Sequence, residues 1–301
     1  MSQTPTIPPD DETRIRALPC WRGAIAITPL HGGLSNANYR VVDRGEAFVA
    51  RLGVDYPFHH VSRAREAAAG GWAHAAGLSP EVIHAGDGAL VCRYIDGRPY
   101  EAADVRADIA RVAALIGACH HGMPRHARGE ACLFWVFHVL RDYSHTLREG
   151  GHRIAGELPR LAAIAAALEA AQVPLPIVFG HHDLLPANFI ADASRLWLID
   201  WEYAAFGTPM FDLANVAQNA EMDERDERNL LESYFGRAPD RALLQSFEAM
   251  KVASALREAL WACVSQLHLN APGADYGAYA DACMKRFDIA HDGYRGKHPA
   301  P

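Results

Sequence analysis

The chain has 301 residues, of which 50% are apolar and 22% charged, and its formal net charge is −7. This composition is typical of a globular protein, and its acidic balance predicts no nucleic-acid partner, because phosphate backbones require a basic face. The N-terminus lacks an apolar signal core and no apolar run is long enough for a membrane span, so we expect a cytoplasmic protein. The 6 cysteines form no C-x-x-C pair, which favours buried reduced thiols over a zinc site or disulfides.

The first part of the chain is predicted to form a small sheet. After a proline-rich start and a short helix over 13–18, apolar runs predict strands at 25–30, 38–42 and 47–52. The turn between the first two strands contains Gly32, Gly33, Ser35 and Asn36. Backbone N–H groups of such a turn can approach phosphates, although an ordinary hairpin has the same composition. Arg51 ends the third strand, either as a phosphate-contacting cation or as a solvated edge charge.

A helix and two further strands complete this region. Ser62 and Arg63 open a helix that ends at Gly77, and its Glu66 either pairs with Arg51 or is an exposed helix charge. Strands at 81–85 and 89–94 flank Gly86-Asp87-Gly88, which predicts a hairpin turn. We place a domain boundary after residue 96, with a β-rich unit at 1–96 and a helix-rich unit at 97–301.

The helix-rich unit is predicted from apolar periodicity. Helices are expected at 105–121, 134–149, 154–172 and 252–267. The third of these contains mostly Ala, Leu and Ile and is therefore expected to be buried. The mixed charges of 221–228 predict a solvated helix surface.

The segment 177–216 carries the strongest chemical signal. A short apolar run leads into His181-x-Asp183-x4-Asn188, and a second apolar run at 196–199 ends in Asp200. Phosphoryl transfer needs a carboxylate that orients the nucleophile and hard oxygen ligands for magnesium, which Asp183, Asn188 and Asp200 would supply. The alternatives are that Asp183 caps a turn and that Asn188 starts a helix. His181 is predicted to brace the loop, and His182 has no assigned role.

These motifs resemble those of the choline/ethanolamine kinase group within the aminoglycoside phosphotransferase-like superfamily. The resemblance rests on His181-x-Asp183-x4-Asn188, on Ile199-Asp200-Trp201-Glu202-Tyr203-Ala204 and on Phe211-Asp212-Leu213-Ala214-Asn215. It extends upstream to Gly32-Gly33-Leu34-Ser35-Asn36 with Tyr39, to the strand around Arg51, and to Ser62-Arg63-x-x-Glu66. Together these segments span most of residues 25–265. Two departures are visible, since His182 and Ser62 stand where the group usually has Asn.

The resemblance implies a fold, a cosubstrate and site residues. The fold would be α+β and protein-kinase-like, with a small antiparallel-sheet N-terminal lobe carrying one helix and a larger, mostly helical C-terminal lobe. ATP and Mg²⁺ would bind between the lobes, with Asp183 as catalytic base and with Asn188 and Asp200 as metal ligands. It also implies an Arg51–Glu66 ion pair, adenine near 91–95 including Val91 and Tyr94, and a structural role for Asp212.

The acceptor pocket is expected in the helical half, around the helix at 252–267. Trp261 falls opposite the apolar face of that helix, on the side that carries Glu258. A tryptophan beside a carboxylate suits a cationic ligand, although Trp261 could instead pack under another helix. The resemblance favours the pocket, because choline kinases place aromatic residues on this helix. Glu202, Tyr203, Tyr276 and Tyr279 are further candidates.

The leading hypothesis is an ATP- and Mg²⁺-dependent kinase that phosphorylates an alcohol, namely choline, ethanolamine or a related amino alcohol. The acceptor would be a small cationic molecule. A kinase for thiamine, a sugar or an aminoglycoside is the alternative within the superfamily. A catalytically silent nucleotide-binding module is the alternative from another class, although both Asp183 and Asp200 are present. The sequence does not indicate the oligomeric state.

Overall fold

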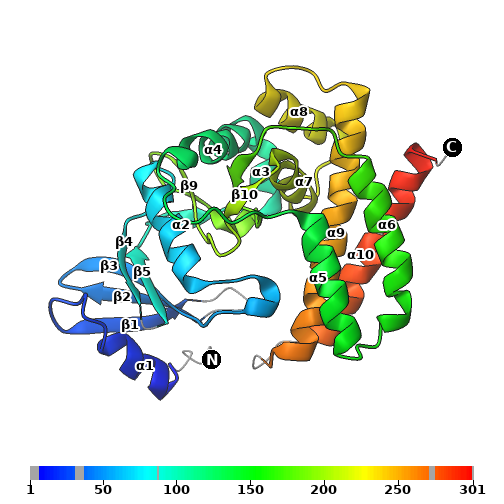
Figure 1. The fold of residues 1–301 in the computed structure, drawn as a ribbon. Coiled ribbons are helices and arrows are strands. Elements are labelled where there is room, and N and C mark those ends of the chain that lie inside the picture. Colours follow the sequence, from blue (N-terminus) through cyan, green and yellow to red (C-terminus); the bar gives the residue numbers. More distant parts are fainter. Residues whose placement is uncertain (1–6, 31–36, 87, 271–274, 300–301) are drawn as a thin grey trace, which may run out of the picture.

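An antiparallel sheet and a larger group of helices make up the described part of the chain (Figure 1). The protein is described from a computed structural model, which places residues 7–30, 37–86, 88–270 and 275–299. Gly32, Gly33, Ser35 and Asn36, the predicted phosphate-contacting turn, lie outside these residues. None of the described helices has both the length and the apolarity needed to cross a membrane.

The sheet is built from neighbouring antiparallel strands. In the described residues its order is β1 (Ile25–Leu30), β2 (Ala37–Asp43), β3 (Glu46–Leu52), β5 (Ala89–Arg93) and β4 (Val82–Gly86). Buried and less buried positions alternate along β2 and β3, as expected for strands that bury one face. Each of these strands lies within a residue or two of the range predicted from its apolar run.

Helix α1 (Pro9–Arg16) contributes to the core on one face of this sheet. Its Ile15 is buried in a cluster with Val41, Phe48 and Ala50 from β2 and β3. The helix starts 4 residues before the predicted Thr13, because Pro9 lies at a first-turn position where its missing N–H costs nothing. Three acidic residues in that first turn also stabilise the positive end of the helix dipole.

Helix α2 (Arg63–Ala75) lies between the sheet and the helical part of the molecule (Figure 1). Its Ala69 and Ala73 are buried in the large hydrophobic core that the helical part supplies. A second small sheet follows, in which β6 (Arg98–Pro99) pairs with β8 (Phe189–Ala191), and β8 pairs with β9 (Leu196–Leu198). The segment after β5 is thereby held next to the strands that flank the predicted catalytic loop.

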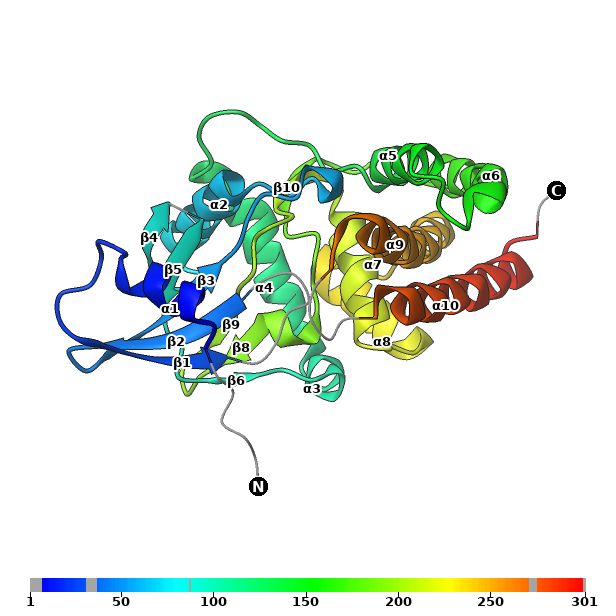
Figure 2. The ribbon, with the colours of Figure 1, turned by 90° about the horizontal axis from the view of Figure 1, so that it is seen from below.

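The helical part is organised around α9 (Arg241–His268), which packs against α5, α6, α7 and α10 (Figures 1 and 2). The described helices here are α3 (Ala102–Ala107), α4 (Ile109–Gly122), α5 (Val136–Glu149), α6 (Leu158–Ala170), α7 (Pro209–Asn219), α8 (Glu224–Phe235), α9 and α10 (Tyr276–Lys297). Almost every residue of the central part of α9 is buried, so this helix forms the middle of the core.

Three expectations for the helices differ from the structure. The helix predicted over 105–121 is two helices, α3 and α4, which meet at Asp108. Helix α6 was expected to be buried, but only Leu158, Leu161, Ala165 and Leu168 are; its exposed alanines reflect high helix propensity rather than burial. The charged stretch 221–228 is only partly solvated, because Glu227 of α8 is buried and paired with Lys251.

Candidate active site

The loop 181–188 lies between β7 (Val178–Gly180) and β8, and Asp212 of α7 holds its first residues. The Asp212 carboxylate accepts the backbone N–H groups of His181 and His182, each at 2.7 Å, and it also contacts His120 Nε2 at 2.9 Å. Burial alone would raise the pKa of Asp212, but these histidine contacts outweigh it and hold the pKa below its usual range. Asp212 therefore fixes the loop backbone as a buried carboxylate.

His181 is buried and linked to both neighbouring segments. Its Nε2 lies 2.8 Å from the Ile199 carbonyl, and its Nδ1 lies 3.2 Å from the Asp183 backbone nitrogen, whose N–H donates to it. Burial lowers the pKa of His181, so the ring is neutral and can donate at one nitrogen while it accepts at the other. These are the contacts that a loop-bracing histidine needs, since they connect the residue before Asp200 to Asp183.

His182, to which the sequence assigned no role, is a packing residue. Its ring stacks on Phe134 with a centroid distance of 4.2 Å and an angle of 16°. The ring lies over Gly180 and Gly207, where an added Cβ would come within 2.6 Å and 2.8 Å of Nε2. Gly207 belongs to β10 (Ala205–Gly207), which pairs with β7, so glycines on two paired strands make room for the imidazole. His182 itself has a left-handed backbone, with φ at 64°.

Asp183 presents a half-buried carboxylate that has no hydrogen-bond partner among the described residues. Burial raises its pKa well above the usual value, Arg257 opposes the rise, and nearby carboxylates add to it. Asn188 Nδ2 donates to the Asp183 carbonyl at 2.8 Å, which leaves the Asn188 amide oxygen available to a ligand. The loop thus places the Asp183 carboxylate and the Asn188 amide oxygen, both without a partner among the described residues, in one short segment.

Asp200, at the end of the second apolar run, joins this loop to the sheet. Its Oδ1 lies 2.7 Å from Arg51 Nη1 of β3, and its backbone is left-handed with φ at 70°. Such a conformation in a non-glycine residue is sparsely populated and is typical of functional sites. The contact with Arg51 lowers the pKa of Asp200 although burial would raise it. Asp200 is therefore a carboxylate directed toward Arg51 and the sheet.

A network of buried ion pairs surrounds Asp200. Arg51 contacts Glu66 of α2, so the expected Arg51–Glu66 pair is present. Arg63, to which the sequence gave no separate role, contacts Glu66 at 2.6 Å and Glu202 at 3.0 Å through Nη1. Glu202, predicted as an acceptor-binding residue, is thus paired with Arg63, and its pKa is raised by burial and by Asp200.

Of the two residues expected near adenine, Val91 lies in the middle of β5 and Tyr94 directly follows that strand, but Val91 does not face the side where Arg51 lies. Val91 pairs with Ala50 in the register of β3 and β5, and both side chains are buried in the core next to α1. Because side chains alternate along a strand, the partners that share the Arg51 face are Leu90 and Cys92. Tyr94 lies under Arg40, whose guanidinium is 5.1 Å from the ring centroid.

The predicted acceptor residues of α9 and its surroundings lie together, but Trp261 is not on a solvated face. It is 8% exposed, its Nε1–H donates to the Tyr203 hydroxyl at 2.9 Å, and His59 stacks on its ring at 4.8 Å. Tyr276 and Tyr279 meet the ring edge-on, and Tyr279 also donates to Glu258 at 2.6 Å. The polar helix face expected here is covered by the short helix η1 (Pro57–His59) and by α10.

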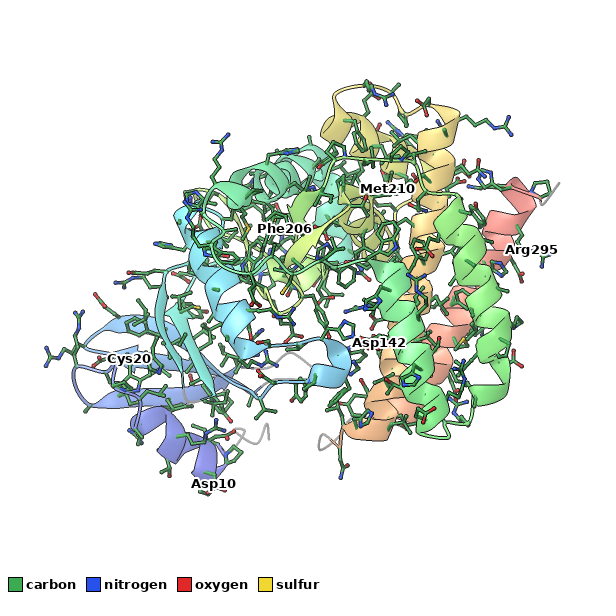
Figure 3. The ribbon with its side chains drawn as sticks, viewed as in Figure 1. Asp10, Cys20, Asp142, Phe206, Met210 and Arg295 are labelled. Carbon is green, nitrogen blue, oxygen red and sulfur yellow. The ribbon has the colours of Figure 1, made fainter. Side chains whose placement is uncertain are left out.

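Sequence reasoning missed His59 and Arg257 in this region. His59 contacts Tyr143 at 3.2 Å and Ser265 at 2.8 Å, and burial lowers its pKa to about 2. The adjacent His60 contacts Asp142 of α5 at 2.6 Å, and Asp142 lies beside η1 (Figure 3). Arg257 lies over the Tyr203 ring at 4.4 Å. No periodic or motif signal marks these residues, because their neighbours are distant in sequence.

Comparison with known proteins identifies the family. The model of the phosphotransferase enzyme family matches residues 26–251. The chain belongs to this family. Among curated proteins, it is 24% identical over 268 residues to the protein LicA of Haemophilus influenzae, a match that covers 86% of this chain and 77% of the relative.

Solved structures agree with the fold. A choline/ethanolamine kinase family protein from Mesorhizobium loti is 27% identical, with a TM-score of 0.74 over 93% of this chain and 94% of that one. The choline kinase LicA from Streptococcus pneumoniae is 20% identical, with a TM-score of 0.77 over 95% of this chain and 98% of that one. The predicted α+β, protein-kinase-like fold, with an antiparallel-sheet lobe and a helical lobe, is confirmed.

Proposed function

We propose that the protein is an ATP- and Mg²⁺-dependent kinase that phosphorylates the hydroxyl of a small alcohol: choline, ethanolamine or a related amino alcohol. The observation that carries this proposal is the Asp183 carboxylate, which has no hydrogen-bond partner among the described residues and lies on a loop fixed by Asp212. Membership of the phosphotransferase enzyme family supports the reaction class, and the named kinases among the relatives support the class of acceptor.

In this proposal Asp183 accepts the proton of the acceptor hydroxyl. The hydroxyl oxygen forms a bond to the γ-phosphorus of ATP, the bond from that phosphorus to the bridging oxygen breaks, and ADP leaves. The raised pKa of Asp183 suits this role, because a stronger base takes up a developing proton more readily. His181 and Asp212 keep the carboxylate in place and take no proton themselves.

The residues around the loop fit a magnesium ion. The Asn188 amide oxygen has no hydrogen-bond partner among the described residues. Asp200 contacts Arg51 through Oδ1, and its other oxygen, Oδ2, has no partner among these residues. Such hard oxygen ligands are those that Mg²⁺ prefers. Bound there, the ion would neutralise phosphate charge.

Arg51, held by Glu66, is proposed as the cation of the sheet that contacts the phosphates. Residues 1–96 would form the nucleotide-binding lobe, and 97–301 the lobe with the catalytic loop and acceptor pocket.

The test is a turnover assay with ATP and Mg²⁺ over choline, ethanolamine and other amino alcohols, with thiamine, sugars and aminoglycosides as competing classes. We expect phosphorylation of an amino alcohol, and we expect Asp183→Ala to lower kcat by roughly 10²–10⁴. ATP binding without turnover of any acceptor would instead indicate a silent nucleotide-binding module. Near-normal turnover by Asp183→Ala would remove Asp183 from the reaction.

A further inference from the structure

Arg257 is a buried arginine whose hydrogen-bonding groups are not satisfied by the described residues. The residue is 3% exposed, and its guanidinium lies over the Tyr203 ring at 4.4 Å. Its Nη1 makes one long contact of 3.4 Å with Glu258. Nε and Nη2 are buried and have no hydrogen-bond partner in the part of the chain described. Buried charged donors are costly without an acceptor, so this edge of Arg257 calls for a further partner.

The face of α9 that carries Arg257 is the one that meets the catalytic loop. Ser254, one helical turn before Arg257, contacts the Asn215 side chain at 3.2 Å. Asn215 in turn accepts the backbone N–H of Leu184, the residue after Asp183, at 2.7 Å. Arg257 also acts electrostatically on Asp183. Arg257 and its unsatisfied edge therefore lie within electrostatic reach of the loop that carries Asp183.

The chemistry of this edge is specific. Nε and Nη2 lie side by side on the guanidinium plane, and their parallel N–H bonds match the two oxygens of a carboxylate. The nearby carboxylates are otherwise engaged: Glu258 receives Tyr279 and the long Nη1 contact, and Glu202 receives Arg63. One face of the Trp261 ring is covered by His59. An oxyanion of the ligand suits these surroundings better than a quaternary ammonium enclosed by aromatic rings alone.

We propose that the acceptor carries a carboxylate in addition to the hydroxyl that is phosphorylated, and that Arg257 binds this carboxylate through Nε and Nη2. The preferred substrates would then be hydroxy-amino acids rather than the amino alcohols that lack the acid group. Glu258 accepts from Tyr279 and lies 3.4 Å from the same guanidinium, but each carboxylate oxygen can accept a further bond, so it could also meet the ammonium of such a zwitterion. The inference rests on the proposed kinase activity and replaces the amino alcohol as preferred acceptor with the corresponding hydroxy-amino acid.

Matched acceptor pairs test it, with ATP and Mg²⁺ and the full chain. L-serine is ethanolamine with an added carboxylate, and L-homoserine is 3-aminopropan-1-ol with one. We expect kcat/KM of the wild type to favour the acid in at least one pair by about tenfold or more, as for a site built to bind a polar group. Arg257→Met should abolish that preference, and Arg257→Lys should restore it only in part, because lysine lacks the parallel edge.

Arg237→Met is the control, since Arg237 is an exposed arginine that pairs only loosely with Asp240 at 3.5 Å. It should leave the preference unchanged. The inference would be overturned if the wild type phosphorylates ethanolamine or choline but prefers, in both pairs, the compound that lacks the carboxylate. That result would leave the kinase activity intact, and a buried water would then be the partner of Arg257. Absence of turnover with every acceptor class would refute the proposed function itself. If the Arg257 variants fail to fold, the ratios of kcat/KM that the wild type shows within each acceptor pair still test the preference for a carboxylate.

Discussion

Replacing Asp212 by Asn tests how the loop 181–188 is held. The carboxylate accepts the His182 N–H at one oxygen, and the other oxygen accepts the His181 N–H and contacts His120. An amide keeps only one acceptor oxygen, so at least one buried backbone N–H would face an NH₂ group. An unsatisfied buried donor costs about 1–3 kcal/mol, and the remaining bonds lose their charge assistance. We therefore expect Asp212→Asn to lower the free energy of unfolding by about 2–4 kcal/mol.

Urea unfolding of purified wild type and variant measures this difference. Asp192→Asn is the matched control, because its carboxylate also accepts backbone N–H groups, from Ser194 at 2.7 Å and Arg195 at 2.8 Å, but in an exposed turn. The control should cost at most about 1 kcal/mol, since water can replace the lost acceptor. Equal losses in the two variants, or a loss below about 0.5 kcal/mol for Asp212→Asn, would refute the argument from buried acceptors.

Three further predictions concern the same site. Burial raises the pKa of Asp183 and Arg257 opposes the rise, so the acid limb of kcat/KM against pH should lie above the usual range of an aspartate. In Arg257→Met the acid limb should move to higher pH, because Asp183 loses a nearby positive charge and stays protonated to higher pH. An acid limb at the same pH in both proteins would contradict this prediction. Glu66→Gln should lower the free energy of unfolding by about 2–4 kcal/mol, because Glu66 is buried and two half-buried arginines lose a charged partner. Glu81→Gln, in an exposed pair with Arg93, should lower it by less than about 1 kcal/mol. His182→Asn should lower the free energy of unfolding by about 1–3 kcal/mol, because the stack on Phe134 is lost. Much of the activity should remain, since Asn tolerates the left-handed backbone. A large fall in kcat with unchanged stability would instead indicate a chemical role for His182.

The sheet and the loop 181–188 could be predicted from sequence because their signals are local. Apolar runs bounded by turn residues predict strands, and the positions observed for β1 to β5 follow them closely. The spacing from His181 to Asn188 places its residues in one loop, and Asp200 ends an apolar run beside it. The structure brings these residues near one another as this pattern indicates: Asn188 Nδ2 donates to the Asp183 carbonyl, and the Asn188 carbonyl accepts the N–H of Ile199, the residue before Asp200.

Other features of the site depend on contacts that a linear pattern does not contain. Helix α9 has an apolar face and an opposite face with Glu258 and Trp261, yet almost all of 252–265 is buried because α5, α7, α10 and η1 cover it. Trp261 and Arg257 are therefore interior residues, although periodicity predicts a polar face there. Val91 shows a different difficulty: its strand was predicted, but its face depends on the register with β3, and a shift by one residue reverses every side chain.

Arg51 and Arg257 differ in how far the described residues satisfy them. Arg51 contacts both Glu66 and Asp200 through Nη1, so a nucleotide that binds there must share a cation that two carboxylates already neutralise. Arg257 has a free edge among the described residues, so a ligand gains its interaction without breaking an existing pair. The affinity for a ligand depends on how much better a protein group is satisfied in the bound state than in the unbound state. A site therefore discriminates most strongly between ligands where the wrong ligand would leave a buried donor unpaired. The acceptor side, rather than the phosphate side, is accordingly where this chain should be most selective.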